Sequence, residues 1–213
     1  MPRRPSSLVH ASVVALALVV NTAPAAAQVQ LSFYSDRPAT APSPNLPFPG
    51  GTLLCTATAA GSPTGFSFDF GDAAVRTALC PANPELLSNL TGNFGARFTG
   101  AIVAPSAGTY QMTLNTDDGD VLTINGTTVA SDWFAKAGGP GSLTVNLLQG
   151  ANPFVLDYFQ GPCCGAFATL TLGPGLTVTP PPPNPSVVPE PATISLMATG
   201  LLVLGTAARR RRA

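Results

Sequence analysis

The chain has 213 residues, of which 9% are charged and 45% hydrophobic, and its formal net charge is zero. Its only histidine, His10, lies in an apolar N-terminal segment, so the rest of the chain has none for acid-base catalysis, a Ser-His-Asp triad or a histidine metal site. Between the two terminal segments described below, four basic residues stand against nine acidic ones, a net charge of −5. This balance disfavours binding to nucleic acid and to anionic lipid surfaces, and it is compatible with a cation site.

Residues 1–27 have the three parts of a secretory signal peptide. Arg3 and Arg4 form a positively charged start, residues 8–20 form an apolar segment, and residues 25–27 are small alanines at a cleavage site. The segment predicts export through the Sec pathway, with a mature chain that starts near Gln28.

Residues 28–176 are expected to form one domain around a single core. Five prolines between positions 38 and 49 predict an ordered surface loop early in this domain, because no strand tolerates that density. Hydrophobic residues alternate with polar ones in residues 109–115 and 166–172, which predicts half-buried strands. Further strands are predicted at residues 29–34, 52–58, 65–70, 101–103, 120–124, 127–129, 142–147 and 154–159.

The connections support the same fold class. Asn125-Gly126 predicts a type I′ hairpin turn, because both central positions of that turn need positive φ. At most a short helical turn fits, at residues 73–79 or 83–89. The sequence therefore predicts an all-β protein, an antiparallel β-sandwich.

The four cysteines of the exported domain predict two disulfides. We expect the adjacent Cys163 and Cys164 to bond separately to Cys55 and Cys80, and a vicinal disulfide is the alternative. No Cys-x-x-Cys spacing exists, so structural cross-links are favoured over redox catalysis.

Carboxylates are the remaining candidates for chemistry. Asp117 and Asp118, in the segment Asp117-Asp118-Gly119-Asp120, would suit calcium, and a polar hairpin turn is the alternative explanation. Asp69 and Asp72 have the composition of a paired-carboxylate glycosidase site, but a strand end followed by a turn explains them as well.

Several short motifs of the domain resemble the protective-antigen-type (PA-fourteen) domain, a jelly-roll-like β-sandwich. They are Phe98-Thr99-Gly100, Gly108-Thr109-Tyr110, Thr116-Asp117-Asp118-Gly119, Leu122-Thr123-Ile124-Asn125-Gly126, Asp132-Trp133 and Leu156-Asp157-Tyr158-Phe159. In the yeast adhesin branch of that family, two aspartates joined by a cis peptide bind a calcium ion that also coordinates sugar hydroxyls. The resemblance implies a carbohydrate-binding module with Asp117 and Asp118 as calcium ligands. The candidate ligand-binding residues are Asp117, Asp118, Trp133 and Gln160, although the adhesins have an asparagine where Gln160 stands here. Trp133 is a candidate for stacking on a sugar ring, and partial burial in the core is the alternative that its place in the family pattern favours.

The C-terminal part reads as a spacer followed by a sorting signal. Residues 177–187 include four consecutive prolines and predict a stiff polyproline linker. Residues 188–213 begin with Val188, Pro189, Glu190 and Pro191, continue with an apolar run at 192–208 and end with four arginines at 209–212. The apolar run spans roughly 26 Å as a helix, just enough to cross a membrane, and the arginines keep the C-terminus in the cytoplasm.

This tail resembles the PEP-CTERM sorting signal of Gram-negative bacteria, in which an exosortase recognises Pro-Glu-Pro. A simple tail anchor is the alternative. The resemblance implies transient anchoring in the inner membrane by one transmembrane helix, with exosortase as a partner and the periplasm, outer surface or extracellular matrix as destination.

Together, these features predict a non-catalytic surface or matrix module that binds a glycan such as exopolysaccharide, and not an enzyme. A secreted carboxylate-dependent glycoside hydrolase and a structural matrix protein with protein partners are the alternatives.

Overall fold

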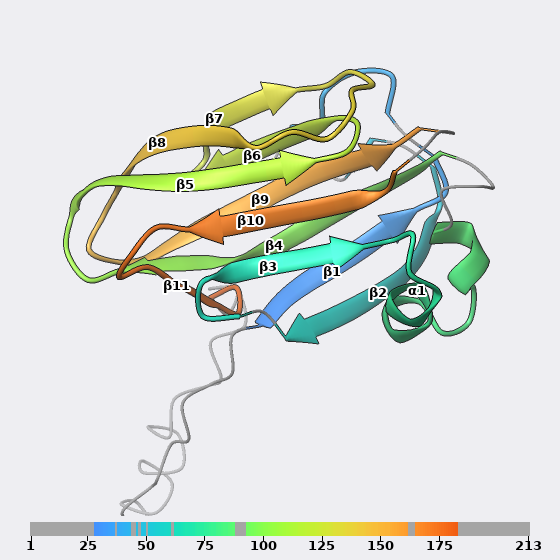
Figure 1. Ribbon diagram of the computed structural model, residues 1–213, viewed down its shortest axis with the longest axis horizontal. Coiled ribbons are helices and arrows are strands. Elements are labelled where there is room, and N and C mark those ends of the chain that lie inside the picture. The colour runs from blue at the N-terminus through green and yellow to red at the C-terminus, as the bar shows by residue number, and fades with distance from the viewer. Residues whose placement is uncertain are drawn as a thin grey trace, which may run out of the picture.

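The computed structural model describes residues 28–182, apart from residues 37, 44–45, 47, 50, 61, 88–92 and 162–164. This part is all-β and forms two antiparallel sheets that face each other (Figure 1). The predicted signal peptide, residues 183–187 of the predicted linker and the predicted transmembrane helix lie outside the described residues. Within the described residues, no helix combines the length and the hydrophobicity that a bilayer crossing requires.

The larger sheet has seven strands and the smaller one four. In spatial order, the larger sheet consists of β2 (Leu53–Ala60), β1 (Gln28–Tyr34), β4 (Phe94–Ala104), β9 (Gly150–Gln160), β6 (Asp120–Ile124) and β7 (Thr127–Asp132), and β11 (Thr177–Thr179) also pairs with β4. The smaller sheet consists of β3 (Gly65–Asp69), β10 (Phe167–Leu172), β5 (Gly108–Thr116) and β8 (Gly141–Leu147). Two short helices, α1 (Ala73–Leu79) and the 3₁₀-helix η1 (Pro84–Leu87), follow β3.

The strands form where hydrophobic residues alternate with polar ones, because successive side chains of a strand point to opposite faces. In β1, Val29, Leu31 and Phe33 are buried, whereas Gln28 and Gln30 are exposed. A similar alternation in β8 and β10 lines the facing side of the smaller sheet with apolar side chains, whereas all five residues of β6 are buried.

Phenylalanine rings from the two sheets meet in this core. The ring centroids of Phe66 and Phe68 in β3 lie 5.4 and 5.8 Å from that of Phe98 in β4. Phe154 of β9, the neighbour of β4 in the larger sheet, also stacks on Phe66, at 6.2 Å. Such ring pairs add to the area that the aromatic side chains bury, so they fix how the sheets face each other.

The predicted hairpin at Asn125-Gly126 is confirmed. Asn125 has φ of 52° and Gly126 has φ of 76°, and the two residues join β6 to β7. Positive φ at both positions is what a type I′ turn requires.

The structure corrects the sequence prediction at two strands. β4 covers eleven residues, whereas the alternation predicted only residues 101–103, because Gly95 and Gly100 interrupt the pattern. β11 lies in the segment predicted as linker: its residues pair with 101–103 of β4, and Val178 is buried. The domain therefore continues past residue 176, to Thr179.

The predicted disulfide pairing is wrong for the first two cysteines. Cys55 of β2 is bonded to Cys80, the residue that follows α1. Neither is therefore available to Cys163 or Cys164, which lie outside the described residues. The bond ties α1 to the edge of the larger sheet, and its short span was not evident from sequence because spacing does not determine connectivity.

Replacing both Cys55 and Cys80 by alanine should lower the free energy of unfolding by about 3.5 kcal/mol, the chain-entropy value for a loop of this size. Their separation is 25 residues. Urea unfolding monitored by circular dichroism measures the loss. The single Cys55→Ala variant should lose almost as much as the double variant, because either change breaks the same bond. Additive losses from the two single variants would contradict this pairing.

Candidate functional site

The acidic turn, Asp117 to Asp120, connects β5 to β6 at one end of the sandwich. Asp117 and Asp118 are each only 7% exposed, and Asp120 is 2% exposed. Asp118 adopts positive φ, 60°, which aspartate tolerates better than most residues. Its peptide bond to Asp117 is trans, since the described residues contain no cis peptide, and in this the turn differs from the yeast adhesin pattern.

Two glycines of the neighbouring loop lie against the two carboxylates. The backbone N–H of Gly161 donates to Asp118 Oδ2 over 2.7 Å. A Cβ on Gly165 would lie 2.8 Å from Asp117 Oδ2, and one on Gly161 would lie 3.2 Å from Asp118 Oδ2. Larger residues at these positions would displace the carboxylates, so Gly161 and Gly165 form a cradle that fits the acidic pair.

Tyr158 and Gln160 support this cradle from β9. The Tyr158 hydroxyl donates to Gln160 Oε1, and Gln160 Nε2 donates to the carbonyl oxygens of Gly161 and Gly165. Burial raises the pKa of Tyr158 well above 10.0, and the negative charges of Asp117 and Asp118 raise it further. The phenol therefore stays neutral and serves as a donor beside the acidic pair.

The segment from Trp133 to Gly138, which we call the aromatic loop, is fastened to the acidic turn. Asp118 N–H donates to the carbonyl oxygen of Lys136 over 2.8 Å, and Gly138 N–H donates to Asp117 Oδ1 over 3.2 Å. The position of the loop therefore depends on the conformation of the turn.

Lys136 adds an ion pair to this attachment. Its ammonium lies 2.6 Å from Asp120 Oδ2 and 3.2 Å from Asp132 Oδ2, and Thr116 also donates to Asp120 Oδ2. Burial lowers the pKa of Lys136, but the hydrogen bonds and charges of Asp120 and Asp132 outweigh burial and raise it above 10.5. The nearly buried Asp120 thus has an internal counter-ion.

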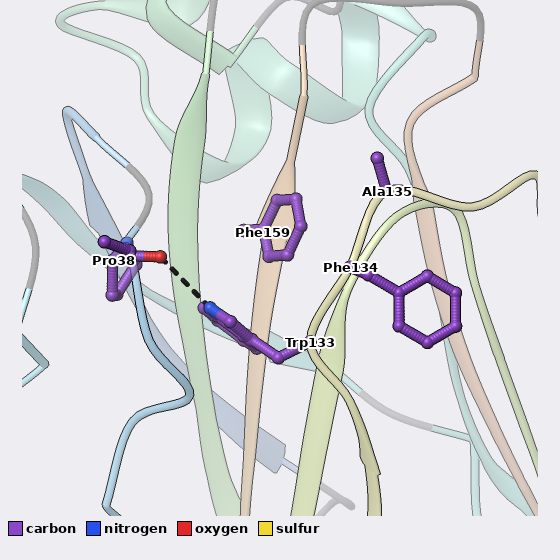
Figure 2. Close-up of a pocket in the computed structure, with 6 residues that line it drawn as sticks. Pro38, Trp133, Phe134, Ala135 and Phe159 are labelled. Atoms are coloured by element: carbon purple, nitrogen blue, oxygen red, sulfur yellow. Dashed lines mark hydrogen bonds between the residues drawn. The ribbon is translucent and has the colours of Figure 1, made fainter.

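A hollow of about 290 Å³, lined by residues of apolar type, lies beside the aromatic loop (Figure 2). It is lined by Pro38, Ala39, Trp133, Phe134, Ala135 and Phe159. The Trp133 indole N–H donates to the carbonyl oxygen of Pro38 over 3.0 Å, and its ring meets the Phe159 ring edge to face at 4.8 Å. Figure 2 shows the Phe134 ring directed away from these two rings, and the Phe134 side chain is 58% exposed.

The hollow adjoins the acidic turn through Phe159. The Phe159 N–H donates to the carbonyl oxygen of Gly119 over 2.9 Å, and a Cβ on Gly119 would lie 2.0 Å from the Phe159 ring. Only glycine fits at position 119 without displacing this ring. Trp133 therefore lies at a neighbouring surface and not at the carboxylates, whereas Gln160 and the two carboxylates all lie against Gly161 or Gly165.

The proline-rich segment that contributes Pro38 crosses the outer face of the larger sheet. Arg97 of β4 donates to both carboxylate oxygens of Asp157 in β9, at 2.7 and 2.9 Å, and to the carbonyl oxygens of Ser43 and Leu46. Burial raises the pKa of Asp157 above its ordinary value of 3.8, although the Arg97 guanidinium opposes that shift. This pair holds the segment in place.

The other carboxylates considered in the sequence have structural contacts. Asp69 Oδ1 accepts from Gly71 N–H at the end of β3. Asp72 Oδ1 accepts from Ala74 N–H and caps the start of α1. Both contacts fit the strand end and turn that the sequence suggested as the alternative to a paired-acid site.

Lys136 and Pro38 were missed by the sequence reasoning. Lys136 is the only lysine of the chain, and the signal that could have identified it is its isolation among apolar residues shortly after Asp132. Pro38 contributes to the site through its backbone carbonyl oxygen, and since every residue has one, the sequence could not have identified it.

Comparison with known proteins identifies the tail. The PEP-CTERM protein-sorting motif matches residues 187–212, which contain Pro189, Glu190 and Pro191. The chain is thus a two-sheet β-sandwich protein with a C-terminal sorting signal. It carries a PEP-CTERM motif, as predicted, and this motif implies processing by an exosortase and sorting to the cell surface.

Solved structures match the sandwich at low sequence identity. An anti-sigma factor domain-containing protein is 15% identical with a TM-score of 0.51, and the match covers 75% of this chain but only 50% of that one, so this chain spans half its length. A PA14 sugar-binding domain from an RTX adhesin is 20% identical with a TM-score of 0.43, and the match covers 70% and 91% of the two chains.

The A domain of epithelial adhesin 9 from Candida glabrata, solved in complex with Galb1-3GlcNAc, is 15% identical with a TM-score of 0.43, and the match covers 73% and 90%. PA14 domains are thus among the structural neighbours of the sandwich, as the sequence motifs predicted. No curated protein matches the chain.

Replacing Lys136 by methionine should lower the free energy of unfolding by about 3 kcal/mol at neutral pH, because it leaves the buried Asp120 carboxylate without its counter-ion. Urea unfolding of the two proteins measures the difference. Adding Asp120→Asn to the variant should restore part of the loss, since that change removes the buried charge and keeps an acceptor for Thr116. A double variant less stable than Lys136→Met would contradict the ion-pair account.

The ion pair between Lys136 and Asp120 also makes the stability of the protein depend on pH. Because the folded-state pKa of Lys136 is raised, its stabilisation is fully present below its ordinary value of 10.5 and is lost as pH rises through the raised pKa. The stability difference between the wild type and Lys136→Met should therefore be constant near neutral pH and shrink in strongly alkaline buffer.

Proposed function

We propose that the protein is a non-catalytic surface module that binds carbohydrate through the end of the sandwich that carries the acidic turn. The observation that carries this proposal is the adjacent pair Asp117 and Asp118, held by the cradle of Gly161 and Gly165. Carboxylates fixed in this way are acceptors for sugar hydroxyls, and the Trp133 ring beside the turn offers an apolar surface of the kind that a pyranose ring covers.

Calcium is proposed as the ion that joins the acidic pair to the sugar. Asp117 Oδ2 makes no hydrogen bond with a described residue, and Asp117 forms no ion pair among them, so part of its charge remains for a cation. Carboxylate and carbonyl oxygens are the ligands that calcium prefers. Asp117, Asp118 and the carbonyl oxygens of the cradle would hold it. No group of three acidic, histidine or cysteine residues suited to a metal exists in the described residues, so the binding should be weak.

The absence of catalysis is part of the proposal. Glycoside hydrolysis uses two carboxyl groups on opposite sides of the scissile bond, roughly 5 to 10 Å apart. Asp117 and Asp118 are neighbours in one turn, and Asp69 and Asp72 are occupied by backbone N–H groups. This arrangement favours a binding module over a carboxylate-dependent hydrolase.

The destination follows from the two terminal segments. We infer export through Sec, transient anchoring in the inner membrane of a Gram-negative bacterium, and exosortase-dependent delivery to the outer surface or matrix. The producer's own exopolysaccharide is the glycan that we propose as ligand.

Calcium should stabilise the wild type and leave the Asp117→Asn, Asp118→Asn double variant unchanged, because amides lack the charge that binds the ion. At 100 times the dissociation constant the gain is about 2.7 kcal/mol. Thermal unfolding with calcium or with chelator measures it, and a glycan array in the same two buffers measures sugar binding. The fold should survive, with Asp69→Asn as the control that keeps the response. A wild type that ignores millimolar calcium and binds no glycan in either buffer would refute the proposal.

Replacing Glu190 by alanine should leave full-length protein in the inner membrane, because the Pro-Glu-Pro sequence that exosortase reads is broken. Cell fractionation with immunoblotting locates the protein, and Glu85→Ala, a change in the domain, serves as the control. Normal surface delivery of Glu190→Ala would reduce the tail to a simple anchor.

A further inference from the structure

The larger sheet ends at an edge without charge. β2 is its terminal strand, and among the described residues only β1 pairs with it. Neither the eight residues of β2 nor the seven of β1 include a charged residue or a proline. Proteins usually protect a strand edge with lysine, proline, a bulge or a covering segment, because its unpaired backbone groups accept another strand.

The strands at the other three ends of the two sheets differ from this one, and β11, which pairs only with β4, is just three residues long. β3 ends in Asp69, and β7 ends in Asp132, which is ion-paired to Lys136. The pairing of β7 with β6 is also irregular at Leu122 and Thr123. β8 carries no charge, but it lies beside β7 of the opposite sheet. Among the described edges, β2 thus has the least protection.

Among the described residues, the contacts that protect the edge of β2 are confined to its first half. The disulfide at Cys55 ties α1 to the strand, and the register with β1 is irregular between Phe33 and Tyr34 (Figure 1). From residue 56 to residue 60 the register is continuous, and the outward-facing Thr56, Thr58 and Ala60 are exposed. Five residues of regular strand therefore remain for pairing.

Shallow hollows flank this open half. One, of about 350 Å³, lies over β1 and β2 and is lined by Gln30, Leu31, Ser32, Thr56, Ala57 and Thr58. Another, of about 340 Å³, lies at the end of the strand, between Ala60 and residues of β3 and β10. Strand addition to a sheet edge draws affinity from backbone hydrogen bonds and uses such hollows for alternate side chains.

We propose that residues 56–60 are a docking edge for the same residues of a second copy of this chain, in antiparallel pairing. Two identical edges match each other through a two-fold axis, with Thr58 opposite Thr58 of the second copy. The side chains that meet are threonines and alanines, so backbones approach without obstruction, and no charge on either strand repels its copy. The two larger sheets then form one continuous sheet. This pairing is independent of carbohydrate binding.

The sorting signal explains how molecules with so short a docking edge could associate. Molecules that are sorted to the same surface have a high effective concentration, so even a weak pairing between them is populated. Lateral contact through β2 would then link neighbouring molecules on the surface or in the matrix.

Sedimentation equilibrium of the full chain in detergent tests the proposal. The wild type should reach twice the mass of one chain as concentration rises. Thr58→Lys should stay monomeric, because it places two ammonium groups opposite each other across the axis. Thr144→Lys is the matched control: it puts the same charge on an exposed threonine of edge strand β8, and it should dimerise like the wild type.

Opposite charges at position 58 separate a loss of pairing from a loss of folding. Thr58→Glu should also be monomeric, whereas an equal mixture of Thr58→Lys and Thr58→Glu should recover the doubled mass. A wild type that remains monomeric at every soluble concentration, a Thr58→Lys variant that dimerises unchanged, or a mixture that does not associate would each overturn the proposed edge.

Discussion

Eleven consecutive residue pairs join β4 to β9 at the centre of the larger sheet, and both parts of the site take their positions from this register. The register sets Arg97 opposite Asp157 on the outer face, where the pair holds the proline-rich segment. It also sets Phe94 opposite Gln160, at the end where the cradle begins. If β4 slipped by one residue along β9, the Arg97 charge would turn into the apolar core and Asp157 would lose its partner, so burial strongly favours the observed pairing.

Successive side chains of β9 point to opposite faces of the sheet, and in this way β9 contributes to both the cradle of the acidic pair and the hollow beside the aromatic loop. Tyr158 points between the sheets, where its hydroxyl supports the cradle, and the next residue, Phe159, points to the outer face and forms a wall of the hollow. Gly119 contacts the Phe159 ring directly. Two neighbouring residues of one strand thus connect two surfaces with different chemistry, one negatively charged and one apolar.

Much of the fold was predictable because its signals are local. Alternating residues identified most strands, Asn125-Gly126 identified its hairpin, and the motif around Asp117 identified the turn. The rest depends on contacts between distant residues. Lys136 pairs with Asp120 only because the aromatic loop folds back, and Cys55 pairs with Cys80 because α1 returns to the sheet edge; neither contact has a local pattern. β11 was hidden because a three-residue strand before a run of prolines resembles the linker.

The pairing of β11 determines which way the molecule faces. β11 lies along residues 101–103 of β4, whereas the cradle begins beside Phe94, at the other end of the same strand. Seven residues of strand separate these points, a distance of about 23 Å. Since the chain passes from β11 into the polyproline segment and the sorting tail, a tethered molecule has its attachment at one pole and the acidic turn at the other. The candidate site therefore lies at the end of the sandwich opposite to the end from which the chain continues toward its sorting signal.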